Sequence, residues 1–400
     1  MVSVGFVYLF AFGVRPLIDE AIGLRLVAGA GTDEAQMQAM IWGMVGMWAF
    51  AAGCLAVRPP RAQSPEESSD AWARCFLWIA LAMAAVHALF AFRAGALTLN
   101  FGQNRIAYLM SLVGSGQVLL SRDLSFVALG LGFFGASRWA RVGAVGWAAA
   151  ALVLLPNLLV SSRSALTQMV FLGLLVVVLQ GLRQAKPVRA RVVVLVLGVL
   201  TLMGLSLGVA RGVDEEPGGA LRPVIHFSQT FDMAESLELS LLRISEPQYG
   251  QSWAEDLLYT YIPRALDPEK PIVYGAFRLQ QQVYPELTPP DEVLIGTFPI
   301  GAWGEGFANF GYAGIVLTLG LLGWAVSRLY ARIFEGPARF QAWALVLYCL
   351  TCANALSYTR SVGQFLAAWV YLSVLLAITT GLAAMLHRLR PSPVAQKENA

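Results

Sequence analysis

Apolar runs close to the length of a membrane-spanning helix recur along the whole chain. A helix needs about 20 mainly apolar residues to cross the hydrocarbon core of a bilayer. The runs lie at approximately 2–14, 36–57, 72–92, 117–137, 142–160, 165–182, 192–210, 311–331, 341–357 and 362–386. They predict an all-α fold, a polytopic integral membrane helix bundle of about ten transmembrane helices.

The charge content supports a membrane protein. Charged residues make up 13% of the 400 residues, whereas a soluble protein carries roughly a quarter. The net charge of +3 comes from Lys and Arg gathered in short clusters between apolar runs, which is a topology pattern and not a sign of nucleic-acid binding. Two runs are less regular: the first is short, and Arg122 and Asp123 lie near the start of the fourth.

The basic clusters predict an orientation. They follow the second, fourth, sixth, eighth and tenth runs, and cytoplasmic loops are enriched in Lys and Arg. With both termini inside, the outer face receives residues 15–35, 93–116, 161–164, 211–310 and 358–361. The chain then divides into N-terminal transmembrane helices (1–210), one long outer loop (211–310) and C-terminal transmembrane helices with a cytoplasmic tail (311–400).

The long outer loop is patterned as a helix near its start. Apolar residues recur at helical spacing, and acidic residues take another face. The apolar positions are Phe227, Phe231, Ala234, Leu237, Leu241 and Ile244, and the acidic positions are Asp232, Glu235 and Glu238. We expect an amphipathic helix that lies on the membrane surface or caps the bundle.

Four arginines are predicted to reach the outer face, where the positive-inside bias disfavours them. Arg163 lies in "SSRSALTQ", Arg211 at the outer end of the seventh run, Arg264 in "YIPRALDPEKP", and Arg360 in "LSYTRSVGQ". Converging guanidinium groups suit an anion with several oxygens. The alternative is that each arginine snorkels to lipid headgroups or pairs with acids of the loop.

A second polar feature is "GAWGEGFANFGYAG", residues 301–314, which precedes an apolar helix. Glu305 stands among aromatic residues, and a carboxylate in such a dry setting is suited to act as a general base. It can equally cap the helix or pair with an arginine. His226 is the only histidine predicted to reach outer-face chemistry and serves as a reserve base.

No HExxH, DxD or Walker pattern occurs in the sequence, and its GxSxG string, residues 204–208, lies inside the apolar run 192–210 and not at a strand-to-helix turn. Metal, nucleotide and serine-hydrolase chemistry therefore lack a motif in the required context, and we expect no cofactor. An outer-face enzyme without nucleotide must take its energy from the substrate. A lipid-linked pyrophosphate is such a substrate, and an arginine cluster is suited to hold it.

The order of these motifs resembles the Wzy-type O-antigen or exopolysaccharide repeat-unit polymerases. "SSRSALTQ" opens a transmembrane helix, the long loop contains "YIPRALDPEKP", and "GEGFANFGYAG" leads into another helix. The motifs that carry the likeness span roughly residues 150–330. The rest of the chain matches the family only in hydropathy. It implies a GT-C-like glycosyltransferase in the bacterial inner membrane with its active site facing the periplasm.

The resemblance also implies substrates and roles. A growing glycan would pass from undecaprenyl pyrophosphate onto a new lipid-linked repeat unit, among membrane lipids and with a chain-length regulator as a candidate partner. Arg163, Arg264 and Glu305 fall in the matching motifs, with Glu305 as base. Arg211 and Arg360 are additions from topology. Further substrate contacts are expected from His226 and from Lys270, which can alternatively pair with Glu269. The aromatic residues Tyr261, Trp303 and Phe307 are candidates for stacking on sugars, and the alternative for each is packing.

Three alternatives remain open. An O-antigen ligase would use a similar donor but a lipid A core acceptor, with a similar membrane plan. A lipid-linked glycan flippase would move the substrate without forming a bond, although paired broken helices in two related halves are not evident. A non-catalytic membrane scaffold would not need arginines in several tight outer turns.

Overall fold

The computed structural model describes residues 32–58, 70–93, 116–135, 143–159, 198, 233–262, 266–271, 273–286, 300–335, 341, 343–348 and 361–388. Within these residues, all regular secondary structure is helical. The predicted all-α class is therefore confirmed for the part of the chain that the structure describes.

Four of the described helices are long and apolar enough to cross a membrane. They are α3 (Asp33–Leu55), α4 (Asp70–Arg93), α14 (Gly301–Phe334) and α16 (Val362–Arg388). These helices cover four of the predicted apolar runs, and they indicate a multi-pass membrane protein.

Two further predicted runs are also helical but shorter, and the described residues of the run 341–357, namely 341 and 343–348, are helical as well. The two shorter runs form α6 (Gly116–Gly135) and α7 (Gly143–Leu159). Arg122 and Asp123 lie within α6, and the Arg122 Nε atom pairs with the Asp123 carboxylate at 2.9 Å. The predicted runs at 2–14 and 165–182, and nearly all of 192–210, lie outside the described residues.

The described helices belong to two compact units. The first contains α3, the loop helices α11 (Met233–Arg243), α12 (Gln251–Tyr259) and α13 (Gly275–Val283), α14 up to residue 331, and the start of α16 up to residue 370. The second contains α4, α6, α7 and the remainder of α16. A core of Leu77, Ala80, Ala84, Leu129 and Val153 holds the second unit together. The predicted division at residues 210 and 310 stays a prediction.

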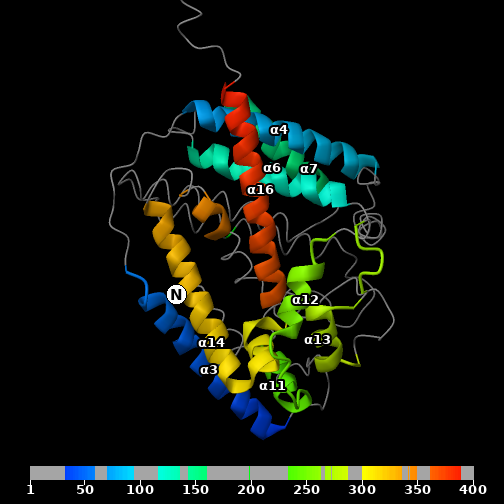
Figure 1. Cartoon of the computed structure of the whole chain (residues 1–400), viewed down its shortest axis with the longest axis vertical. Helices are drawn as coiled ribbons and strands as arrows, with labels where there is room; N and C mark the ends of the chain where they lie inside the picture. Colours follow the sequence, from blue (N-terminus) through cyan, green and yellow to red (C-terminus); the bar gives the residue numbers. More distant parts are fainter. Residues whose placement is uncertain are drawn as a thin grey trace, which may run out of the picture. The chain divides into compact units, whose positions relative to one another are not determined.

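In the first unit, α3 lies alongside α14 (Figure 1), and the two backbones approach closely. A Cβ atom added at Gly323 would overlap the carbonyl oxygen of Phe50. Near the other end of the contact, Trp42 stacks on Tyr312 with ring centroids 4.4 Å apart. Small residues that let two helices approach are typical of packing within membranes.

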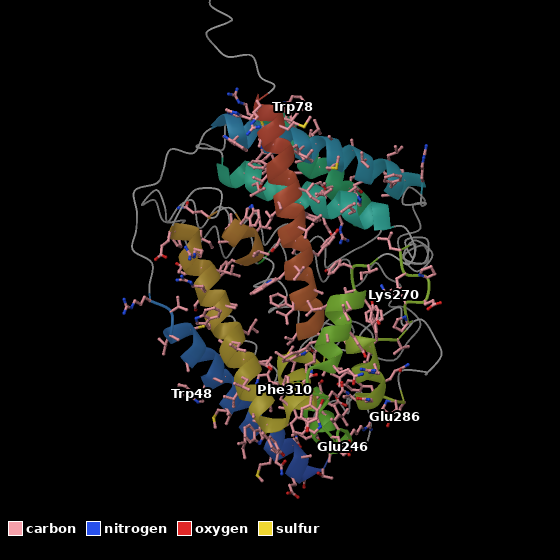
Figure 2. The ribbon with its side chains drawn as sticks, in the orientation of Figure 1. Trp48, Trp78, Glu246, Lys270, Glu286 and Phe310 are labelled. Atoms are coloured by element: carbon pink, nitrogen blue, oxygen red, sulfur yellow. The ribbon has the colours of Figure 1, made fainter. Side chains whose placement is uncertain are left out.

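The helix α14 is broken near its start. Phe310 and Gly311 have non-helical backbone angles, and Gly311 has a φ of 62°, a conformation that glycine adopts without steric cost. Phe310 marks this turn in Figure 2. The short helix before the break and the long helix after it touch where Gly314 meets the carbonyl of Gly306. The "GEGFANFGYAG" motif is therefore a helical hairpin.

The predicted amphipathic helix of the loop is present as α11, but it is an interior element. Every residue from Met233 to Ser240 is buried, including Glu235 and Glu238. Met233, Ala234 and Leu237 pack into a core with Ala39 and Phe50 of α3 and with α14 residues. An exposed polar face is therefore not observed over residues 233–240, and the predicted position of the helix on the membrane surface or as a cap of the bundle stays a prediction.

The close contact between α3 and α14 predicts a position-specific effect of alanine. Gly323→Ala places a methyl group against the Phe50 backbone, and such overpacking costs about 1–3 kcal/mol. Gly320→Ala is the matched control on the same helix, because its Cβ would lie at 3.7 Å from the Ala49 carbonyl, an ordinary contact. We expect thermal unfolding in detergent to show a lower Tm for Gly323→Ala only. Equal Tm values would contradict this packing.

Candidate functional site

Glu305 lies in the short helix before the α14 break and is 1% exposed. Its Oε2 atom accepts hydrogen bonds from the Val362 backbone N–H at 2.7 Å and from the Trp253 indole N–H at 3.1 Å. Its Oε1 atom has no hydrogen-bond partner among the described residues. One oxygen of the carboxylate is therefore held in place, and the other is buried without a partner among the described residues.

Asp256 of α12 is a second buried carboxylate, with 0% exposure. Its Oδ2 atom accepts hydrogen bonds from the Ser361 hydroxyl at 2.8 Å and from the Ala276 backbone N–H at 3.2 Å. Burial raises the pKa of Asp256 from 3.8 to about 7, although these two hydrogen bonds oppose the rise. Asp256 and Glu305 are close enough to act on each other electrostatically.

Ser361 connects this pair to the start of α16. Its hydroxyl accepts a hydrogen bond from the Gln364 backbone N–H at 2.9 Å, which is an N-cap contact. The first turn of a helix presents free N–H groups and a partial positive charge. Glu305 and Ser361 satisfy two of these groups, so the site is built on the N-terminus of α16.

A second helix begins at the same place. The first N–H groups of α13 are bonded by Glu255, which accepts from Gly275 at 2.8 Å, and by Asp256, which accepts from Ala276. Arg278 of α13 neutralises Glu255 through a 2.6 Å ion pair. Two helix N-termini therefore converge on Asp256, and this arrangement offsets part of the cost of burying its charge.

Backbone packing leaves no room around Asp256. A Cβ atom at Gly363 would come within 2.5 Å of Oδ2, and one at Gly275 would overlap Oδ1. Both glycines belong to the first turns of the converging helices, α16 and α13. They allow the helix starts to approach the carboxylate directly.

The short helix that carries Glu305 is fixed at its C-terminal end. Backbone N–H groups of Gln248 and Tyr249 donate to the carbonyls of Ala308 and Asn309 at 2.9 and 2.8 Å. The Asn309 amide also exchanges hydrogen bonds with Ser252 of α12 at 2.8 and 3.0 Å. These contacts fix α12 and the short helix relative to each other, which sets the positions of Asp256 and Glu305.

The structural alternative for Glu305, that it caps a helix, is realised at α16 and not at its own helix. The sequence analysis missed Asp256 and Ser361. A signal for Ser361 is present, since "SVGQ" at 361–364 before an apolar run has the S-x-x-Q spacing of a capping box. Asp256 has no such signal, because its burial depends on α13 and α16, which are remote in sequence.

Four predicted substrate contacts lie among the described residues. One of them, Phe307, packs against the core that contains Trp303 and lies edge-on to Tyr312 with ring centroids 5.2 Å apart. Trp303 is 0% exposed, and its indole donates to the Gly43 carbonyl of α3 at 3.1 Å, so the expected sugar-stacking role is not supported and Trp303 is a core residue. Lys270 lies in the loop between α12 and α13 (Figure 2). Its ammonium group donates to the Ile262 carbonyl at 3.1 Å and lies over the Tyr274 ring, so it links two parts of this loop. Tyr261 is half-buried in the same loop.

The remaining predicted site residues lie outside the described part of the chain. They are Arg163, Arg211, His226, Arg264 and Arg360. Their predicted convergence on a pyrophosphate therefore stays a prediction. Within the described residues, no group of three or more His, Cys, Asp or Glu side chains is arranged to hold a metal ion.

Comparison of this chain with protein-family models, curated proteins and solved structures finds no match. The residues and the geometry of the carboxylate pair are therefore the basis for assigning a function.

The buried charge of Asp256 predicts a pH-dependent stability. Because the folded state binds the proton more tightly than the unfolded chain, the free energy of unfolding falls as pH rises from about 4 to about 7. Asp256→Asn keeps both hydrogen-bond acceptances and removes the charge. We expect it to be more stable than the wild type at about pH 8, by on the order of a few kcal/mol, with the difference vanishing near pH 4.

Thermal unfolding of the two proteins across this pH range measures the effect. Glu246→Gln is the control, because Glu246 is exposed and its replacement takes no charge out of the interior. The prediction is contradicted if the wild type is more stable than Asp256→Asn at about pH 8, because burying the charge of Asp256 would then not lower the free energy of unfolding.

Proposed function

We propose that this protein is an integral membrane glycosyltransferase of GT-C-like architecture that polymerises lipid-linked oligosaccharide repeat units. The single observation that carries the proposal is the Glu305 carboxylate. It is buried in the motif that resembles the polymerases, with Oε2 fixed by two donors and Oε1 without a partner among the described residues. A rigidly held carboxylate with one unpartnered oxygen supports a role as a general base.

In the proposed reaction, the acceptor is a sugar hydroxyl of a new lipid-linked repeat unit, and the donor is a glycan on undecaprenyl pyrophosphate. Glu305 takes the proton of the acceptor hydroxyl as its oxygen attacks the anomeric carbon of the donor. The bond between that carbon and the pyrophosphate oxygen breaks, and the electron pair remains on the pyrophosphate. Arg163, Arg211, Arg264 and Arg360 are proposed to stabilise this leaving group.

The proposed location is the outer face of the bacterial inner membrane. The four long apolar helices support a multi-pass protein, and the distribution of Lys and Arg in the sequence supports an outward-facing loop. On that face no nucleotide is required, because the lipid pyrophosphate supplies the energy of the transfer.

The proposal predicts a ladder of products. Purified protein in liposomes is incubated with undecaprenyl-pyrophosphate-linked repeat units extracted from cells that lack this protein. The products are separated by gel electrophoresis. We expect chains of increasing length from the wild type, and a loss of about 10²–10⁴-fold in rate for Glu305→Gln, which retains the shape of the side chain without its basicity.

The same assay separates the alternatives. Transfer only to added lipid A core would identify a ligase, and movement of repeat units across the bilayer without bond formation would identify a flippase. Glu246→Gln is the control for the loss of one carboxylate, because Glu246 is exposed and outside the site. A ladder that is equally strong with Glu305→Gln would remove Glu305 from the mechanism.

A further inference from the structure

The helix α12 exposes apolar side chains and buries polar ones. Leu257 and Leu258 are 44% and 57% exposed, and with the exposed Ala254 they share one face, at spacings of three and four residues. On the opposite face, Ser252 and Asp256 are 1% and 0% exposed. A helix at the surface of a soluble protein has the reverse arrangement, because its apolar stripe packs on the core. The exposed face of α12 therefore has the composition of a surface that meets an apolar environment.

The charged groups of α12 are turned away from this face. The helix has two of them, Glu255 and Asp256. Glu255 accepts a hydrogen bond from the Gly275 N–H at 2.8 Å and forms the 2.6 Å ion pair with Arg278, so it is directed to α13. Asp256 is buried against the starts of α13 and α16. The exposed apolar face is left without a charge.

The apolar exposure continues beyond the end of the helix. Ile262 and Leu266, in the loop that follows α12, are 39% and 78% exposed. Between residues 251 and 262 the exposed side chains are apolar apart from Gln251, which opens the helix. A helix that lies in the boundary between lipid chains and water has such an apolar face on one side and its polar groups on the other.

Two contacts place α12 at the ends of two candidate membrane spans. Trp253 packs edge-on against Phe310, at the break after which the long part of α14 begins, with ring centroids 5.5 Å apart. A Cβ atom at Gly363, in the first turn of α16, would come within 2.9 Å of the Trp253 Cα atom, so the two backbones touch. Figure 1 shows α12 beside the start of α16. The helix therefore lies at the level where two spans begin.

The exposed surface of α14 is apolar from the same level onward. Phe310 and Tyr312 are 38% and 41% exposed, and Leu317 is 57% exposed. These side chains belong to a candidate span, and aromatic residues are enriched where lipid chains meet the headgroups. Leu257 lies one turn after Trp253, which packs on Phe310. The apolar face of α12 therefore adjoins a surface that is in contact with lipid in a membrane-spanning protein.

We propose that α12 is an interfacial helix whose exposed face, formed by Ala254, Leu257 and Leu258, inserts into the bilayer leaflet at which α16 and the long part of α14 begin. This placement of α12 does not depend on the proposed function. Because Asp256 lies on the opposite face of the same helix, the inserted helix holds the Asp256 and Glu305 carboxyls near the depth of the lipid headgroups. A phosphate group attached to a lipid chain lies at that depth.

A bilayer fits this face better than a protein partner does. Each partner in a stable protein complex buries about 800 Å² and shares about ten hydrogen bonds with the other. The exposed face of α12 has three apolar side chains and no polar side chain among them. A bilayer requires neither a matching outline nor hydrogen bonds from the helix.

Photochemical cross-linking of the full-length protein in phospholipid liposomes tests the placement. The photoreactive residue p-benzoylphenylalanine replaces Leu258, which is exposed enough to accept it without repacking the core. The control replaces Glu246, which is exposed and precedes α12 (Figure 2). After illumination, the mass of the intact protein shows what has been captured. We expect the yield of phospholipid adduct to be on the order of tenfold higher at position 258 than at position 246.

The other outcomes of this experiment overturn the placement. Cross-linked dimers at position 258, in place of lipid adducts, would assign the face to a second copy of the chain. Equal yields of lipid adduct at positions 258 and 246, or none at either, would show that the face is not inserted. Position 262 provides a second test of the same surface if the variant at position 258 does not fold. No substrate is present, so the result is independent of whether the protein polymerises glycans.

A charged substitution provides a second measurement. Leu258→Glu keeps a good helix former but places a charge in the leaflet, whereas the same change at a surface in water alters stability only slightly. Leu258→Met is the matched control, because it keeps the face apolar. We expect the Tm in liposomes to fall by a few degrees for Leu258→Glu and to stay unchanged for Leu258→Met. Equal Tm values for the two variants would overturn the placement.

Discussion

The described part of the first unit depends on burying carboxylates against the N-termini of helices. An ionised carboxylate in a dry interior is strongly unfavourable unless donors surround it. Here the donors are the first N–H groups of α13 and α16, the Ser361 hydroxyl and the Trp253 indole. Each carboxylate that satisfies a helix start also fixes where that helix begins. The loop helices, the α14 hairpin and the start of α16 are therefore held by the same set of contacts.

This arrangement removes the opposition between a capping role and a chemical role for Glu305. A carboxylate has two oxygens, and the capping contacts occupy only Oε2. The cap orients the side chain and leaves Oε1 without a partner among the described residues. The break at Gly311 contributes to the same end, because it separates the short helix of Glu305 from the long apolar helix and lets each take its own direction.

Hydropathy was sufficient to predict the long apolar helices, because burial in a bilayer imposes a length that the sequence shows directly. It also placed a helix at Met233–Arg243. It did not predict that Glu235 and Glu238 would be enclosed, nor that Trp303 would pack on α3, because both outcomes depend on which remote helices meet. For the same reason Asp256 was missed, whereas Ser361 was within reach of a local capping pattern.

The choice of residues at the pair favours a chemical role over a purely structural one. Asparagine caps a helix as well as aspartate does, and its amide oxygen accepts the same hydrogen bonds without a charge to bury. The chain instead places two acids within electrostatic range of each other in an interior site, where burial raises the pKa of Asp256 to about 7. Packing and capping do not require that cost in stability. Proton transfer near neutral pH does require a group that titrates there, and the proposed function would account for acids where amides would be the more stable choice.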